Sequence, residues 1–148
     1  MSSRGNDRPD VSTLVLLKAL ADETRLRIVS LLLQADDLCS CEIEAVLGLG
    51  QSNTSRHLGR LRRAGIIVAR QVGHWVHFSL AGVAPGGTAG SETAKAARPA
   101  TELIVKIVLA ARRDTPVLQS DLERLEDYRT SGHSCESIRE WQELCARG

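Results

Sequence analysis

The amino-acid sequence predicts a mainly α-helical fold with one β-hairpin. Apolar residues recur at helical spacing along most of the 148 residues, and the period changes to two only over 66–80. The chain is 43% hydrophobic but only 3% aromatic, so its core must consist mainly of Leu, Val, Ile and Ala side chains. Such a core suits helices packed on helices, and a chain of this length can bury it without disulfides.

Two helices are expected after residues 1–10, a polar segment that we interpret as a disordered arm without the features of a signal peptide. The first helix covers 11–20. Asp22 is a candidate N-cap for the second helix, which residues 35–37 end. Both helices carry Leu-rich apolar stripes at the spacing that packs one helix face into a core.

A helix–turn–helix and a hairpin follow. The third helix covers 42–47, a tight turn contains two glycines, and the fourth helix runs from about 52 to 64. Residues 66–71 and 75–80 then flank Val72-Gly73-His74, which is typical of a β-hairpin. This order of elements predicts a winged helix-turn-helix domain over 11–81.

The remaining chain is expected to be a C-terminal helical extension. Residues 82–100 are rich in Gly, Ala and Pro and are interpreted as a flexible linker or a frayed helix start. Residues 101–148 should form helices, including an apolar one over 103–113 and another with Thr115 as N-cap and Pro116 as first residue. No apolar run approaches about 18 residues, which argues against a membrane span.

Charge is distributed unevenly along the chain, although its formal net charge is only +1. No Asp or Glu occurs over 45–91, and that stretch contains five arginines, Arg56, Arg60, Arg62, Arg63 and Arg70. A basic stripe in a nearly neutral protein indicates binding to a polyanion. A solvated charged face is the ordinary alternative, and the long absence of carboxylates disfavours it.

The expected fourth helix has the chemistry of a DNA-reading helix. In helix-turn-helix proteins the second helix of the motif enters the major groove, where its first residues reach base edges. The expected DNA contacts are Gln51, Ser52, Asn53, Thr54, Ser55, Arg56, His57, Arg60, Arg62, Arg70 and His74. The arginines suit phosphates, whereas Ser52, Asn53, Thr54 and His57 suit base readout. Some of the short polar residues could instead only cap the helix.

Three segments together resemble the ArsR/SmtB family of metal-sensing repressors. Residues 19–28 resemble the opening signature of that family, 51–65 its recognition helix and 73–80 its wing. The resemblance covers roughly 17–80. It implies a homodimer, with the first helix and the helix over 103–113 at the interface, and a double-stranded operator that is an imperfect palindrome.

A Cys-x-Cys pair, Cys39 and Cys41, lies in a segment that resembles the arsenic and antimony sensors of this family. Thiolates are soft ligands that select thiophilic ions. Those sensors often carry another cysteine three residues later, where this chain has Glu44. Cys135 and Cys145 are therefore candidate third metal ligands, from the same or the partner subunit, although either could simply be a buried small hydrophobe.

The spacing of the pair suggests how binding could act on DNA affinity. On an ideal helix, residues two apart point about 200° away from each other. In the arsenic and antimony sensors that this segment resembles, the pair lies at the start of the third helix. Chelation by both Cys39 and Cys41 must therefore pull the start of that helix out of helical form. Ion binding and operator binding would then favour different conformations and oppose each other.

The sequence thus predicts a cytoplasmic, dimeric transcriptional repressor without a permanent cofactor, released from its operator by trivalent arsenic or antimony. Two alternatives stay open, a thiol-based redox or persulfide response and a response to another soft metal such as cadmium, lead or zinc. An enzyme is not expected. A thiol enzyme would need a Cys-x-x-Cys motif or a cysteine beside a Gly-rich phosphate loop, and the chain has neither.

Overall fold

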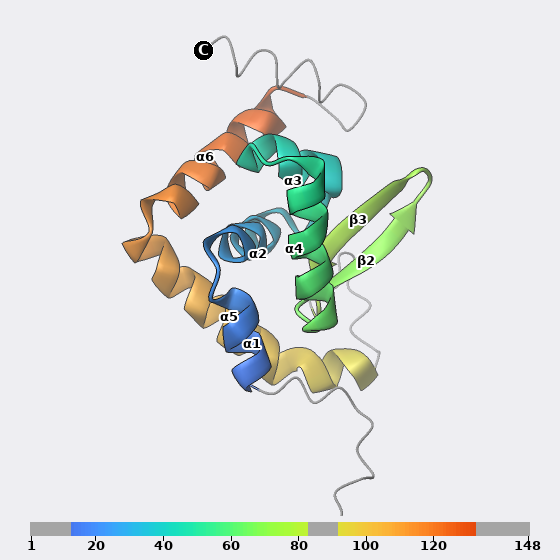
Figure 1. Cartoon of the computed structure of the whole chain (residues 1–148), viewed down its shortest axis with the longest axis vertical. Coiled ribbons are helices and arrows are strands. Elements are labelled where there is room, and N and C mark those ends of the chain that lie inside the picture. Colours follow the sequence, from blue (N-terminus) through green and yellow to red (C-terminus); the bar gives the residue numbers. More distant parts are fainter. Residues whose placement is uncertain (1–12, 83–91, 133–148) are drawn as a thin grey trace, which may run out of the picture.

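The computed structural model describes residues 13–82 and 92–132, with only the backbone described for 92–100 (Figure 1). In these ranges the elements are α1 (Thr13–Leu20), α2 (Glu23–Ala35), β1 (Asp37–Cys39), α3 (Ser40–Leu47), α4 (Gln51–Arg63), β2 (Ile67–Val72), β3 (Trp75–Leu80), α5 (Glu92–Asp114) and α6 (Pro116–Thr130). The predicted arm over 1–10, Cys135 and Cys145 lie outside the described residues.

The predicted winged helix-turn-helix is confirmed. Helices α3 and α4 form the two-helix motif, and β2 and β3 form an antiparallel hairpin in which Ile67 pairs with Leu80 and Val72 with Trp75. Gly73 at the turn has a φ of 61°, a conformation that glycine adopts without strain. The hairpin projects from the body beside α4 (Figure 1).

The sheet contains a third strand that the sequence analysis missed. Strand β1 pairs with β3, so the strand order is β1-β3-β2, and Cys39 lies opposite His77. Residues 35–37 were expected only to end a helix, and Cys39 was expected on the third helix. A strand of three residues that continues directly into α3 is too short to show an alternating pattern.

Helix α5 also differs from the prediction. It begins at Glu92, so of the two alternatives for 82–100, a flexible linker or a helix start, the helix start describes 92–100, whose backbone is helical. Alanine predominates over 94–100, and its high helix propensity outweighs the composition that suggested a linker. The predicted start of the next helix is confirmed, with Thr115 as N-cap and Pro116 at its first position.

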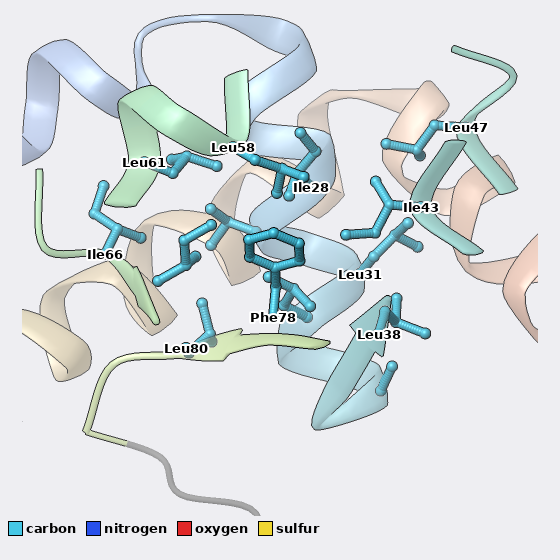
Figure 2. Packing of buried hydrophobic residues seen from close by; sticks show 14 of the residues in the cluster. Ile28, Leu31, Leu38, Ile43, Leu47, Leu58, Leu61, Ile66, Phe78 and Leu80 are labelled. Carbon is cyan, nitrogen blue, oxygen red and sulfur yellow. The ribbon is translucent and has the colours of Figure 1, made fainter. Parts of the chain in front are cut away.

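Helix α2 is the centre of the molecule. Asp22 caps it as predicted, accepting a hydrogen bond of 3.0 Å from the backbone N–H of Arg25. Around α2, side chains from the other elements form one apolar cluster (Figure 2), which includes Ile28, Leu31, Ile43, Leu47, Leu58, Leu61, Phe78 and Leu80. Because α3, α4 and β3 all pack into this cluster, the core fixes the helix–turn–helix relative to the hairpin.

Helix α6 braces the same core from the side of α2 opposite the hairpin (Figure 1). Both carboxylate oxygens of Asp121, which is 1% exposed, lie 2.9 Å from nitrogens of Arg27 on α2. Arg124 donates a hydrogen bond of 3.3 Å to the backbone oxygen of Ala45 on α3. Across the described ranges, no helix is both long and apolar enough to cross a membrane.

Candidate nucleic-acid interface and thiol site

Helix α4 presents a polar and basic surface. Leu58 and Leu61 bury its inner face, which leaves seven polar residues exposed on the outside, Gln51, Ser52, Ser55, Arg56, Arg60, Arg62 and Arg63. Asn53 is half-buried, and its Oδ1 accepts a hydrogen bond of 2.9 Å from Arg56. Arg63 was not in the predicted contact set, although the charge pattern had singled it out.

Two of the predicted base-reading residues lie on the inner face instead. Thr54 is 0% exposed, and its Oγ1 donates a hydrogen bond of 3.0 Å to the backbone oxygen of Gly50. His57 is 8% exposed, with Nδ1 3.3 Å from a guanidinium nitrogen of Arg25. A polar run longer than one helical turn must place some members inward, so we exclude Thr54 and His57 from direct base contact.

The hairpin adds basic groups next to α4. Arg70 and His74 are exposed as the predicted contacts require. Arg70 donates a hydrogen bond of 3.1 Å to Oδ2 of Asp37 on β1, and Nδ1 of His77 lies 3.2 Å from the same oxygen. Asp37, which the sequence analysis did not single out, therefore ties the hairpin to the strand that leads into α3.

Cys39 lies where this strand meets α3. It is 1% exposed, ends β1 and is the N-cap of α3 with φ −79° and ψ 163°. Its backbone N–H donates a hydrogen bond of 3.1 Å to Oε1 of Glu42. Because Cys39 is extended rather than helical, the two cysteines do not lie on one ideal helix, and the prediction that chelation must unwind the start of α3 is wrong in that form. Cys39 is also disulfide-bonded in this structure.

Cys41 carries a free thiol in the first turn of α3 and is half-buried. Burial raises the pKa of this thiol, and the carboxylates of Glu44 and Glu42 raise it further, against a smaller opposite effect of a hydrogen bond with Ser40. A thiol with a raised pKa is largely protonated at neutral pH, so an ion that binds Cys41 must displace a proton.

The donors present suit a soft ion but do not complete a site. When Cys39 is reduced, Cys39 and Cys41 can supply two sulfurs, the ligand type that thiophilic ions prefer. No group of three His, Cys, Asp or Glu side chains that could hold a metal ion occurs among the side chains described, those of 13–82 and 101–132. Glu44, at the position of the third cysteine in the arsenic sensors, is not part of such a group.

Tyr128 on α6 is a neighbour of the thiol site that the sequence analysis missed. Its side chain is buried, and burial together with Glu42 and Cys41 raises the pKa of its hydroxyl far above the usual value. Helix α6 thus reaches the start of α3. The spacing of Leu118, Leu125 and Tyr128 on one helix face was a signal that Tyr128 would point inward.

Comparisons with known proteins agree with this architecture. Residues 22–68 match the pattern of the family described as bacterial regulatory protein, arsR family. The chain is 42% identical over 60 residues to an uncharacterized HTH-type transcriptional regulator of Methanocaldococcus jannaschii, across 40% of this chain and 67% of that protein.

Two relatives with more specific names are also similar. An arsenic resistance transcriptional regulator of Pseudomonas putida is 41% identical over 76 residues, which is 51% of this chain. A cadmium resistance transcriptional regulatory protein of Listeria innocua is 36% identical over 72 residues, which is 49% of this chain. In both cases the match spans 59% of the relative's own length.

Proposed function

Because the chain belongs to the arsR family of bacterial regulatory proteins, we propose that it is a transcriptional repressor that binds operator DNA and leaves it when a soft ion binds Cys39 and Cys41. The observation that carries this proposal is the position of Cys39. It is both the last residue of the strand that pairs with the hairpin and the N-cap of the first helix of the helix–turn–helix.

DNA binding is assigned to the outer face of α4 and to the hairpin. Gln51, Ser52, Asn53 and Ser55 lie at the start of α4, where a recognition helix meets base edges. Arg56, Arg60, Arg62, Arg63 and Arg70 supply phosphate contacts, with His74 at the hairpin turn. Since each phosphate contact releases counterions, operator affinity should fall steeply with salt.

We also assign a two-fold dimer to the protein, with α1 and α5 at the interface. Leu14, Val15 and Leu17 on α1 and Leu109 on α5 are large hydrophobic residues with exposed side chains, Leu14 at 60%. Exposed apolar residues on two helices that contact each other suit association with a second copy. Two α4 helices related by a two-fold axis would read an imperfect palindrome.

The route from the thiols to the DNA is direct. Cys39 is 1% exposed, so an ion that binds both Cys39 and Cys41 can reach the first sulfur only if the junction of β1 and α3 moves. Such movement strains the hydrogen bond between Cys39 and Glu42 and the pairing of Cys39 with His77 on the hairpin. Both DNA-binding parts are then displaced, and linkage makes ion binding and DNA binding antagonistic.

Trivalent arsenic or antimony is the proposed inducer, with Cys135 or Cys145 of either subunit as the candidate third ligand. Both ions are thiophilic, and a small number of sulfur ligands is enough to bind either of them. Cadmium, lead or zinc would use the same thiolates and are the competing inducers.

The experiment first selects a duplex from a random-sequence pool with the reduced protein, then measures its release by fluorescence anisotropy during titration with arsenite, antimonite or cadmium. Release by arsenite or antimonite at lower concentration than by cadmium is expected. Cys39→Ser and Cys41→Ser should bind the duplex like the wild type but resist release. Enrichment of no duplex, or equal release of all three proteins, would contradict the proposal.

A thiol-redox response is the second candidate, and one observation favours it. Cys39 is disulfide-bonded in this structure, and an oxidised sulfur cannot act as a thiolate ligand. If oxidation is the signal, peroxide should release the duplex from the wild type but not from Cys39→Ser, and dithiothreitol should restore binding. Replacing Cys135 and Cys145 by serine in turn would identify the sulfur that pairs with Cys39.

A further inference from the structure

We propose that His57 is a positioning residue whose neutral ring, bonded to Arg25, holds α4 in its DNA-reading orientation, so that discrimination of operator from other DNA weakens in acid. The inference rests on the proposed DNA-binding function. It concerns a histidine that the sequence analysis assigned to base readout and that the structure places beneath the helix.

The contact joins two elements of the domain. His57 projects from the inner face of α4, and its Nδ1 lies 3.3 Å from NH1 of Arg25 on α2. The other side of the same guanidinium donates from Nε to the backbone oxygen of Ala19, at 2.5 Å, near the end of α1. Arg25 therefore bridges the helix proposed to form the dimer interface and the helix proposed to read DNA.

The protonation state of the ring decides whether this contact attracts. A guanidinium has only donors, so Arg25 can bond Nδ1 only when that nitrogen is unprotonated and the ring proton is on Nε2. Protonation of His57 replaces the hydrogen bond with two donors and two positive charges facing each other in a buried site. The orientation of α4 then loses a fixed contact to α2.

The surrounding charges favour the neutral ring. Burial lowers the pKa of His57 most strongly, and Arg25, Arg56 and Arg60 lower it further. Asp22 acts in the opposite direction, with Oδ1 3.8 Å from Nδ1 of His57. Among the described residues, these four charged groups have the largest effects on the ring. The contact is therefore complete at neutral pH and is lost only as the pH falls through the pKa of His57 in the folded protein, which lies below the usual value of about 6.5.

The test must separate orientation from charge, because a protonated His57 also adds attraction for any phosphate backbone. The ratio of affinities for the selected duplex and for a scrambled duplex cancels that general gain. His57→Asn places an amide oxygen near the position of Nδ1 and does not titrate. His57→Ala removes the acceptor.

At pH 7.5 the wild type and His57→Asn should show the same affinity ratio, and His57→Ala a ratio about fivefold lower, the size expected for one lost buried hydrogen bond. As the pH is lowered from 7.5 through the depressed pKa of His57, the ratio should fall about fivefold for the wild type and stay constant for His57→Asn. Two outcomes would overturn the inference. One is the same dependence of the affinity ratio on pH in the wild type and His57→Asn, and the other is an affinity ratio in His57→Ala equal to that of the wild type at pH 7.5.

A second measurement needs no DNA. Nitrogen-15 NMR of the histidine side chains in the full chain should show His57 with its proton on Nε2 at pH 7.5, and a proton on Nδ1 would overturn the inference. If no duplex is selected but this tautomer is found, the DNA-binding proposal fails and the Arg25–His57 contact stands. If a duplex is selected but Nδ1 is protonated, only the positioning role fails.

Discussion

The two helices of the helix–turn–helix differ in how they are held. The start of α3 is tied on several sides, by strand pairing at Cys39, by Glu42 and by Tyr128 of α6. The outer face of α4 is open, with side chains that contact mainly solvent or one another. The start of α3, where the proposed ion ligands lie, is thus part of the packed core. The outer face of α4, which is proposed to bind DNA, depends for its orientation on contacts of the inner face of α4.

The largest effect is expected at the buried pair that fixes α6. Asp121→Asn leaves the Arg27 guanidinium without its counter-charge in a largely buried place, which should lower the free energy of unfolding by about 3 kcal/mol. Urea denaturation measures it. Asp127→Asn, an exposed change on the same helix, serves as control and should change stability by less than about 0.5 kcal/mol. Equal losses would mean that α6 does not brace the core.

On the outer face of α4, a substitution is expected to change DNA affinity and not stability. Arg60→Ala should leave the urea midpoint unchanged, lower duplex affinity by about tenfold at low salt and reduce the slope of log affinity against log salt by about one. Anisotropy at several salt concentrations checks this. Arg129→Ala, an exposed change on α6 outside the proposed DNA-binding surface and the proposed dimer interface, should retain the wild-type slope. An unchanged slope for Arg60→Ala would remove Arg60 from the phosphate contacts.

A smaller effect is expected at the cap of α3. Glu42→Ala removes the acceptor of the Cys39 backbone N–H and should cost about 1 kcal/mol of stability. It should also weaken duplex binding slightly, because the hairpin and α3 meet at this point. Glu126→Ala on the exposed side of α6 is the matched control. If Glu42→Ala lowers stability no more than Glu126→Ala does, the side chain of Glu42 does not stabilise α3.

The smallest effect concerns the rate at which Cys41 reacts. Burial, Glu44 and Glu42 raise the pKa of its thiol, so less thiolate is present at pH 7.5 than in an unstructured peptide. Alkylation by iodoacetamide should be several-fold slower than for glutathione and should increase with pH beyond pH 9. In Glu44→Gln the reaction should be faster at pH 7.5; a slower reaction would contradict the assigned cause.

The sequence predicted the elements that long periodic patterns define, and it missed those that depend on contacts. The helix starts at Asp22 and Thr115 were correct because a capping carboxylate at Asp22 and a proline at the first helical position after Thr115 are local signals. Strand β1 was missed because its three residues form a strand only beside β3. In the candidate site, the exposed arginines of α4 followed from composition. The inward direction of Thr54 and His57, and the approach of Tyr128 to Cys41, needed the packed structure.

The central claim is that an ion at Cys39 and Cys41 disturbs α3 and the hairpin together. Hydrogen–deuterium exchange of the reduced protein, with and without arsenite, tests it most directly. Arsenite should increase exchange in the peptides that cover 37–42 and 75–80, and the increase should be absent in Cys39→Ser. Release of DNA with unchanged exchange in both segments would contradict the account.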